Sequence, residues 1–254
     1  MLNVWAHQQA AAAAVLGKWT PDRLGSKLVA FWDAEDASTL ELSGSAVTAW
    51  TDKKNGNRCA VNISGFKPVF SPNNFNGRPS LVYDGIDDYL TLTGSGINLP
   101  FSGQAREIWA AVSQDAPEDT DAIQRVVTRC GIASTSRFRL ARARLGNVSR
   151  GRVTCGNGAS EAVQTNVQTA FAGISVVRGV ITDADISAVV NKIADAPLAN
   201  IPALTTTPIY LGAENTSIGF WQGKVNALIY TDPLTADEAA KMYQFMTERT
   251  GIAL

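Results

Sequence analysis

The chain has 254 residues, of which 45% are hydrophobic and 18% are charged, and its formal net charge is −1. This length and composition can bury a core without disulfides or metals and exclude a disordered or coiled-coil protein. The apolar runs are shorter than the roughly 20 residues of a membrane-spanning helix, and the balanced charge gives no general attraction to nucleic acid. The single histidine, His7, argues against Ser-His-Asp hydrolases, Cys-His proteases and histidine-rich metal sites.

The three cysteines, Cys59, Cys130 and Cys155, form no CxxC pair, and their spacing is not that of a zinc site. We interpret them as reduced thiols in the core, where free cysteine usually lies. The alternative is a disulfide between Cys130 and Cys155 on neighbouring strands, which requires an oxidising compartment.

Residues 1–24 differ from the rest of the chain. Apolar and small residues recur at helical spacing over 2–16, and an alanine run favours a helix. We predict a short N-terminal helical arm over residues 1–24, which either packs on the following domain or docks on a neighbouring subunit through Trp5 and Trp19. The segment lacks the basic start of a secretory signal, so we expect synthesis in the cytoplasm.

From residue 28 onward, short apolar runs alternate with turn sequences such as Asn-Gly and Asp-Gly, without a helical period. This pattern, continued over about 200 residues, is typical of an antiparallel sandwich or barrel in one domain. The predicted strands are 28–32, 46–50, 79–83, 89–92, 107–112, 124–130, 137–145, 170–177, 186–193, 208–211 and 224–230.

Two segments carry more specific signals. The alanine-rich and valine-rich stretch around Asn191-Lys192 could be drawn as a helix, but we predict a hairpin, because Asn tolerates the left-handed conformation that its turn needs. At the C-terminus, Thr235 and Glu238 form a capping box, and Gly251 ends the helix that follows them.

Four stretches together carry a family resemblance. They are LVAFWDAEDASTL from residue 28, AVTAWTDKKNGNRCAV from 46, NGRPSLVYDGIDDYLTL from 76 and WQGKVNALIYTDPLTADEAAKMYQFMTERTGI from 221. In this order they resemble concanavalin A-like jelly-roll domains of the laminin-G and pentraxin type, over residues 28–254. The resemblance implies an all-β fold, a two-sheet antiparallel jelly-roll sandwich over 25–254 with a C-terminal helix. It also implies binding of carbohydrate or protein on the sheet face or the rim loops.

Such a domain behind a helical arm resembles components of bacteriophage or gene-transfer-agent particles, where these domains form head spikes or tail fibres. By this analogy we expect a protein made in the bacterial cytoplasm and incorporated into a virion or phage-like particle. The expected partners are surface polysaccharides, anionic ones included, neighbouring particle proteins contacted by the arm, and further copies of the chain. Neither nucleic acid nor a membrane span is expected.

The fold family also includes glucanases, and retaining glycosidases need two carboxylates about 5 to 5.5 Å apart. Jelly-roll glucanases carry Glu-x-Asp followed by a second Glu on one strand, and no such run occurs here. Asp33, Glu35 and Asp36 follow a strand and lack the second glutamate, while Glu118 and its acidic neighbours lie in a loop with proline. We therefore expect no catalytic residues and no enzymatic activity.

Calcium needs only oxygen ligands, so Asp84, Asp87 and Asp88 are its candidate ligands. We favour the alternative that Asp84 accepts backbone N–H bonds in the Asp-Gly turn while the other two solvate the loop. The histidine-containing metal site of legume lectins is not expected, because His7 lies in the arm. No phosphate-binding glycine loop is present, so we expect no other cofactor.

Arginine is concentrated in residues 122–160, which contain no acidic residue. With a period of two, one pair of arginines shares a face and the next pair has the opposite parity, which implies a β-bulge between the pairs or arginines on both faces. Either arrangement exposes most guanidinium groups, as a solvated sheet face or as a strip that binds carboxylates or phosphates in two-point geometry. The two pairs are Arg137 and Arg139, and Arg142 and Arg144.

Sugar sites often present an exposed aromatic ring, and Trp221, flanked by glycines, is the best candidate for a ring at the rim. Trp32, Trp50 and Trp109 lie in apolar runs and are expected in the core. The sequence thus predicts a non-catalytic carbohydrate-binding, adhesion or assembly module, with the four arginines and Trp221 as ligand-binding residues. A purely structural virion subunit is the first alternative, and a glycoside hydrolase is the second.

Overall fold

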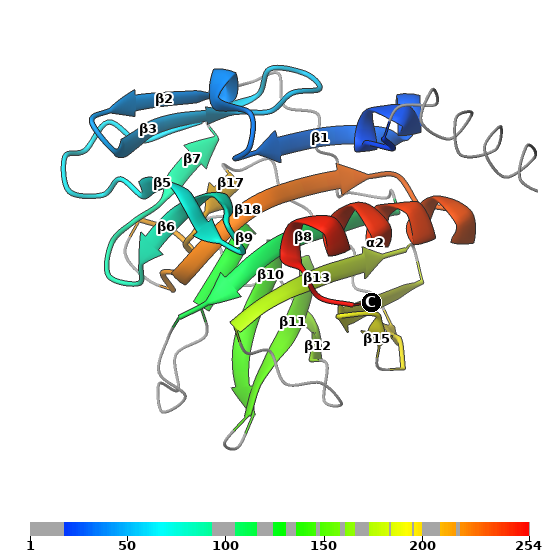
Figure 1. Ribbon diagram of the computed structural model, residues 1–254. Coiled ribbons are helices and arrows are strands. Elements are labelled where there is room, and N and C mark those ends of the chain that lie inside the picture. Colours follow the sequence, from blue (N-terminus) through cyan, green and yellow to red (C-terminus); the bar gives the residue numbers. More distant parts are fainter. Residues whose placement is uncertain are drawn as a thin grey trace, which may run out of the picture.

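A computed structural model describes residues 18–92, 105–115, 124–130, 136–145, 148–157, 161–165, 173–182, 184–194, 196–199, 209–216 and 219–253. Within these ranges the chain forms antiparallel strands, a C-terminal helix, and the short 3-10 helices η1 (Pro21–Lys27) and η2 (Ala37–Thr39), as Figure 1 shows. This confirms the expected all-β class. The helices of the described residues are too short or too polar to span a bilayer.

The strands form two layers. The first layer is centred on β18 (Gln222–Thr231), and β1 (Leu28–Asp33) pairs with the second half of β18. The short strands β15 (Ile193–Ala194) and β16 (Leu198–Ala199) lie at one edge of this layer. From edge to edge it runs through β5 (Val69–Phe75), β6 (Arg78–Asp84), β18, β8 (Arg106–Gln114), β13 (Gly173–Ile181) and β14 (Asp185–Val190).

The second layer contains the strands that carry the predicted binding residues. In pairing order it consists of β2 (Leu40–Ser43), β3 (Ala46–Thr51), β4 (Arg58–Ala60), β7 (Leu90–Leu92), β17 (Ile209–Leu211), β9 (Gln124–Cys130), β10 (Ser136–Leu145), β11 (Val148–Asn157) and β12 (Glu161–Thr165). The single pairing of Ala46 with Val69 joins the two layers at one edge. Cys130 lies on β9 and Cys155 lies on β11, and β10 runs between these two strands. The two cysteines are therefore not on neighbouring strands, which is the arrangement that the disulfide alternative required.

The layers face each other across the main core. A Cβ atom at Gly151 on β11 would lie 2.5 Å from Val190 Cγ2 on β14, so only glycine allows this close approach. Three of the six tryptophans are fully buried in this core, namely Trp32, Trp50 and Trp221. Cys59 is also buried there as a free thiol, and burial raises its pKa.

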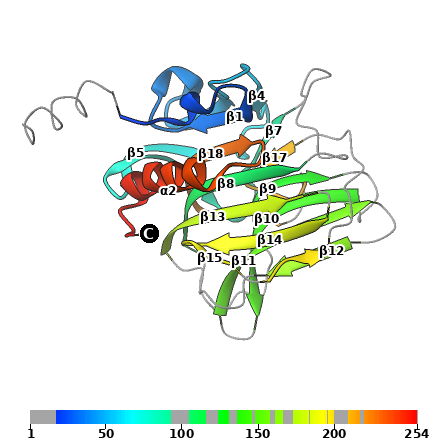
Figure 2. The same cartoon turned by 90° about the vertical axis from the view of Figure 1, so that its right-hand side faces the viewer.

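A second core lies on the outer side of the first layer, beneath α2 (Ala236–Thr250), which Figures 1 and 2 show beside β8 and β13. Trp109 meets Tyr243 edge to face there, with ring centroids 4.7 Å apart. The positions expected for Trp32, Trp50 and Trp109 are therefore confirmed. Apolar burial on both sides of the first layer holds the helix in place.

The local signals at α2 and at the hairpin are confirmed. Thr235 and Glu238 form the reciprocal capping box, and Gly251 closes the helix with a φ of 71°. Asn191 and Lys192 form the turn between β14 and β15, with φ values of 49° and 68°. The Asn191 side chain also accepts a 2.9 Å hydrogen bond from the N–H of Val176, which ties the turn to β13.

Of the two expected arrangements the structure shows arginines on both faces, because the register shift between β10 and β9 leaves its extra residue, Val126, on β9 and not on the arginine-rich strand. The register between β10 and β11 is unbroken, so side chains on β10 continue to alternate past this shift. Arg139 and Arg142 consequently lie on opposite faces of this strand.

The helix expected over residues 2–16 lies outside the described residues, and the arm stays a prediction. The residues that follow it pack on the domain. The Trp19 and Phe245 rings meet edge to face at 6.2 Å, and Leu24 is buried in the core beneath α2.

Candidate functional site

One row of residues crosses the second layer on the face opposite the main core. Register places Arg139 opposite Thr128, Thr128 opposite Tyr210, Tyr210 opposite Thr91, and Thr91 opposite Ala60. Side chains alternate along a strand, so the side chains of Arg139, Tyr210 and Thr91 point away from the core when their neighbours along the strand point inward. Those neighbours are core residues, among them Leu140, Leu211, Leu90 and Cys59. We call this set the outer row.

Three aromatic side chains contact one another beside the outer row, where Tyr89 is part of the main core and Phe66 and Tyr210 pack against it. The Tyr210 ring lies 6.1 Å from that of Tyr89, and the Tyr89 ring lies 6.0 Å from that of Phe66, centroid to centroid. Phe66 and Tyr210 are partly exposed, whereas Tyr89 is only 5% exposed. The N–H of Tyr89 donates to the carbonyl of Phe66 at 3.3 Å, which ties their backbones together. We call Phe66, Tyr89 and Tyr210 the aromatic cluster.

The sequence interpretation did not identify the aromatic cluster. Its one local signal is the Ile209-Tyr210-Leu211 triplet, in which a tyrosine lies on the opposite face from two buried aliphatic residues. The cluster depends on the pairing of β17 with β7, strands that are far apart in the sequence. Burial raises the pKa of Tyr89 above its usual value, so its hydroxyl keeps its proton at neutral pH.

Arg139 and Arg142, the two predicted arginines whose side chains the structure describes, are not exposed. Arg139 is 4% exposed and forms an ion pair with Glu214, which follows β17 and is itself buried. Arg142 is fully buried, lies opposite Gly151 and shares the core-facing side of β10 with Leu140. The expected exposure is therefore wrong for these two, because a distant carboxylate covers one and strand alternation turns the other inward.

The other two predicted arginines, Arg137 and Arg144, have side chains outside the described part of the chain, and their role stays a prediction. Two arginines of the same segment, Arg150 and Arg152 on β11, are partly exposed. They have the same parity as Thr154, which pairs with Arg139, and so lie on the same face as the outer row.

Trp221 does not lie at an exposed rim. Its side chain is fully buried in the main core, and the backbone N–H of Trp221 donates to the carbonyl of Gly212 at 2.7 Å. The neighbouring glycine has a packing role, because a Cβ atom at Gly223 would lie 2.0 Å from the carbonyl oxygen of Ser113. The glycines that suggested a loop instead allow β18 to approach β8 closely.

The three aspartates between β6 and β7 form a compact turn. Asp84 Oδ1 accepts from the N–H of Ile86 at 2.8 Å and of Asp87 at 3.3 Å, while Asp88 Oδ2 accepts from the N–H of Asp84 at 2.9 Å. The first two bonds confirm the turn role expected for Asp84. Asp88 does not solvate the loop as expected, because it is only 5% exposed.

One carboxylate oxygen from each of Asp84, Asp87 and Asp88 lies within 4.8 Å of the others. Burial raises the pKa of Asp88 to about 6; the hydrogen bond from Asp84 lowers it, and the charges of Asp84 and Asp87 raise it further. This group of oxygens is compatible in type with calcium, whose binding here stays a prediction.

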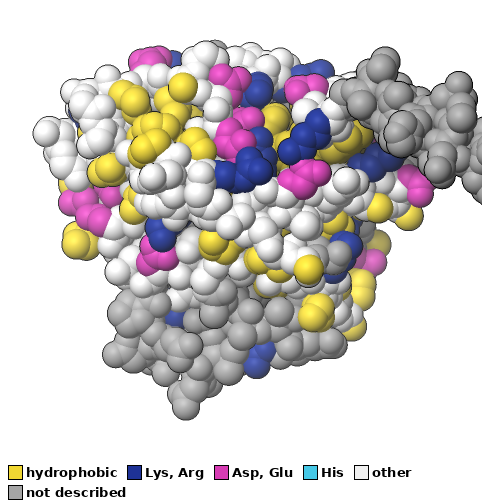
Figure 3. All heavy atoms as spheres, viewed as in Figure 1, with side chains coloured by type: hydrophobic (Ala, Val, Ile, Leu, Met, Phe, Trp, Pro, Cys, Tyr) yellow, Lys and Arg dark blue, Asp and Glu magenta, His cyan; other side chains and the backbone are white. Residues whose placement is uncertain are grey.

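The carboxylates that were considered for catalysis are held by basic residues. Asp33 is buried and pairs with Arg249, and Glu35 pairs with Arg78 at 2.9 Å. Asp36 pairs with Lys53 at 3.0 Å, and this ion pair together with hydrogen bonds from Ser38 lowers its pKa. Figure 3 shows acidic and basic side chains side by side on this face of the molecule. Glu118 lies outside the described residues.

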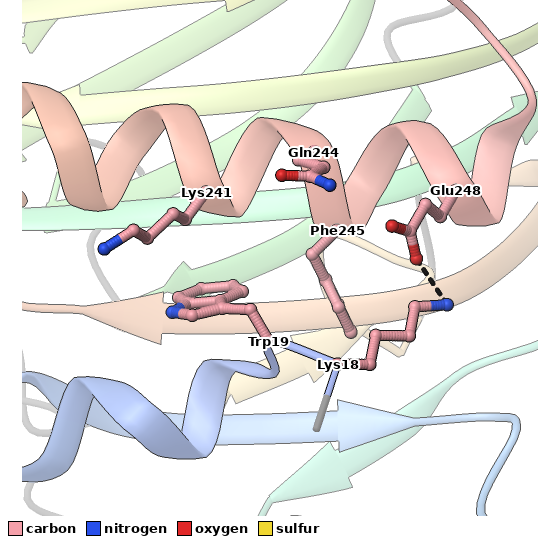
Figure 4. A pocket seen from close by; sticks show the side chains of 6 residues that line it. All are labelled: Lys18, Trp19, Lys241, Gln244, Phe245 and Glu248. Atoms are coloured by element: carbon pink, nitrogen blue, oxygen red, sulfur yellow. Dashed lines mark ion pairs between the residues drawn. The ribbon is translucent and has the colours of Figure 1, made fainter. Parts of the chain in front are cut away.

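A small pocket lies between α2 and the segment before η1, as Figure 4 shows. Its volume is about 110 Å³, below the roughly 300 to 1,000 Å³ of typical ligand pockets. An ion pair between Lys18 and Glu248 closes one side, and the Trp19 and Phe245 rings form another. We assign no ligand to it.

No protein-family model matches this sequence, and no curated protein matches it either. Solved structures do match it. Trypanosoma rangeli sialidase in complex with sialic acid has a TM-score of 0.59 and 14% identity over 87% of this chain, which spans 33% of the sialidase chain. Domain 4 of an extracellular arabinanase from Geobacillus stearothermophilus, in complex with arabinotriose, has a TM-score of 0.58 and 13% identity over 86% of this chain and 98% of that domain.

The binding domain of Paraclostridial Mosquitocidal Protein 1 has a TM-score of 0.61 and 9% identity over 87% of this chain, which spans 52% of that structure. The chain thus corresponds to a third or a half of two of these proteins and to nearly all of the arabinanase domain. At these identities the likeness shows the fold alone, a β-sandwich.

Proposed function

We propose that this protein is a non-catalytic carbohydrate-binding module that holds a glycan at the aromatic cluster on the outer face of the second layer. The observation that carries the proposal is the chain of contacts between Phe66, Tyr89 and Tyr210, in which the outer two rings are partly exposed. A sugar ring has an apolar C–H side that packs on an aromatic side chain, and its hydroxyls need polar neighbours.

The outer row supplies both kinds of contact. Tyr210 offers a partly exposed ring, and Thr91, its partly exposed cross-strand partner, offers a hydroxyl that can donate and accept. The buried Tyr89 supports Tyr210 from the side, which limits the conformational freedom lost when a ligand binds. The arabinanase domain, which matches this chain over 98% of its own length, was solved in complex with arabinotriose, which is consistent with this use of the fold.

The carboxylates support a binding role over a hydrolytic one. An acid catalyst needs a raised pKa and access to the substrate, whereas Asp33 is buried against Arg249 and Glu35 is held by Arg78.

A second part of the proposal concerns the assembly in which the module acts. We propose that the module belongs to a phage-like particle and that residues 1–24 attach it to neighbouring subunits, on the basis of the family resemblance and the amphipathic pattern of the arm.

A glycan array followed by titration tests this function. The parent protein is expected to bind at least one oligosaccharide, and Tyr210→Ala should weaken that binding about tenfold or more, the equivalent of about 1.4 kcal/mol. The matched control is Phe70→Ala, which removes a partly exposed ring on β5 in the other layer and should leave affinity unchanged. The proposal is wrong if the parent binds no glycan, or if Tyr210→Ala binds as the parent does.

A further inference from the structure

We infer that the aromatic cluster binds a twisted or curved glycan chain across two of its rings and does not bind the flat surface of a crystalline polysaccharide. This inference rests on the proposed function and adds the shape of the ligand and its minimum length. It is carried by the distances and angles between the rings of Phe66, Tyr89 and Tyr210.

The cluster offers a ligand two rings. Phe66 and Tyr210 are partly exposed, whereas Tyr89, whose ring both of them contact, is only 5% exposed. The centroids of the two exposed rings each lie about 6 Å from that of Tyr89, so they are at most about 12 Å apart. A short chain of sugars that packs on one of these rings can therefore reach the other.

The two exposed rings are inclined to each other. The plane of the Phe66 ring differs from that of Tyr89 by 38°, and the plane of Tyr89 differs from that of Tyr210 by 62°. The planes of the two exposed rings therefore differ by at least the difference between these angles, about 24°. Because the C–H side of a sugar packs flat on an aromatic face, one sugar cannot lie flat on both rings. Two sugar units can do so where the chain twists or curves between them.

A crystalline polysaccharide presents a different surface. Its chains lie side by side as flat ribbons, so the exposed sugar rings share one plane. Of two inclined aromatic rings, only one can lie flat on such a plane. The stabilisation gained by packing follows the apolar area removed from water, so the second ring contributes little there.

The fold holds the inclined rings in place. Tyr210 lies in the middle of β17, which pairs with β7 on one side and β9 on the other. The N–H of Phe66 donates to the carbonyl of Ile63 at 3.4 Å, and the carbonyl of Phe66 accepts from the N–H of Tyr89 at 3.3 Å. Rings that are held before a ligand arrives lose less conformational freedom on binding, which favours chains that match their inclination.

The first experiment titrates the parent protein with monosaccharides and hexasaccharides of glucose, mannose, xylose, arabinose, N-acetylglucosamine and galacturonic acid. We expect at least one hexasaccharide to bind about tenfold more tightly than its monosaccharide, because only the chain reaches both rings. Phe66→Ala should weaken binding of that hexasaccharide about tenfold and so remove most of the difference. Phe66→Tyr, which keeps the ring, and Phe70→Ala, which removes a ring on β5, are the matched controls and should bind as the parent does.

The second experiment tests the crystalline surface. The parent protein is sedimented with microcrystalline cellulose, chitin and mannan, and Tyr210→Ala is treated in the same way. We expect no more of the parent than of Tyr210→Ala in any pellet, because the inclined rings do not match a flat array of sugars.

The outcomes separate this inference from the proposed function. Hexasaccharide binding that Tyr210→Ala loses and Phe66→Ala keeps would overturn the inference and retain a glycan site at Tyr210. Equal affinity for a hexasaccharide and its monosaccharide, or sedimentation with a solid that Tyr210→Ala lacks, would also overturn the inference alone. Binding to none of the saccharides and none of the solids would overturn the proposed function as well.

Discussion

Arg249, in the last turn of the C-terminal helix, makes a two-point ion pair with Asp33 at the end of β1. Nη1 lies 2.7 Å from Oδ1 and Nη2 lies 3.1 Å from Oδ2, and both side chains are buried. The guanidinium also lies 4.4 Å from the centroid of the Phe245 ring and donates to Asn226 on β18 at 3.1 Å. This one side chain therefore joins α2 to two strands of the first layer.

Removal of Arg249 should be strongly destabilising. Arg249→Met leaves the buried Asp33 carboxylate with a more distant ion-pair partner, Lys53 at 3.5 Å, and a hydrogen bond from the N–H of Glu35, and loss of one partner of a buried ion pair costs about 3 kcal/mol or more. For a chain of this size we expect a fall in melting temperature of about 6 to 12 °C, measured by calorimetry. Arg58→Ala, which removes an exposed ion pair with Glu41, is the control and should leave the melting temperature unchanged. Similar melting curves for both variants would contradict the prediction.

Substitutions at Asn191 in the β14–β15 turn can separate two contributions of this side chain to the stability of the protein. Asn191 adopts a φ of 49° and accepts the hydrogen bond from Val176, so Asn191→Ala loses both the tolerance of this conformation and the acceptor. We expect a cost of about 2 kcal/mol by chemical denaturation. Asn191→Gly keeps the conformational tolerance and should cost about half as much. Equal costs for the two variants would show that the hydrogen bond alone matters.

Local signals in the sequence predicted much of the first layer and its helix. Strands such as 107–112 and 224–230 carry near-continuous apolar runs, because both of their faces are buried. The placement of Arg139 and Arg142 on opposite faces followed from their parity, since a strand has a fixed period of two. These features depend on neighbours along the chain, which the sequence displays directly.

The sequence did not predict β11 and β12, and it did not predict the aromatic cluster. The β11 segment, Val148–Asn157, contains arginine, glycine, serine and asparagine without an apolar run, and it becomes a strand because β10 and β12 pair with it. The contact between Tyr89 and Tyr210 and the ion pair between Arg139 and Glu214 depend in the same way on strand pairing over long separations. Only the register of the folded sheet brings these residues together.

The ion-paired carboxylates lead to a prediction on activity. Both carboxylate oxygens of Glu35 accept a hydrogen bond from Nη1 of Arg78, at 2.9 and 3.0 Å, so both are already occupied. We expect the parent protein to release no more reducing ends from polysaccharides than a heat-inactivated control does. The Glu35→Gln variant should release the same amount as the parent. Hydrolysis by the parent that Glu35→Gln lacks would instead identify an enzyme and would contradict the proposed binding role.

The buried aspartate beside the aromatic cluster predicts a pH dependence of stability. The pKa of Asp88 is raised to about 6 in the folded protein from its ordinary value of 3.8, so the folded state holds its proton more tightly than the unfolded state does. Stability that this carboxyl contributes at acidic pH is therefore lost as the pH rises from about 4 through about 6.

Asp88→Asn removes the charge and keeps an oxygen to accept from the N–H of Asp84. After allowance for solvent screening, we expect this variant to be more stable than the parent by about 1 to 2 kcal/mol at pH 7.5 and equally stable near pH 3.5. Urea denaturation at both pH values tests this expectation, with Asp237→Asn as the exposed control. A destabilised Asp88→Asn protein at pH 7.5, or a calcium-dependent rise in melting temperature that only the parent shows, would assign the charge of Asp88 to cation binding instead.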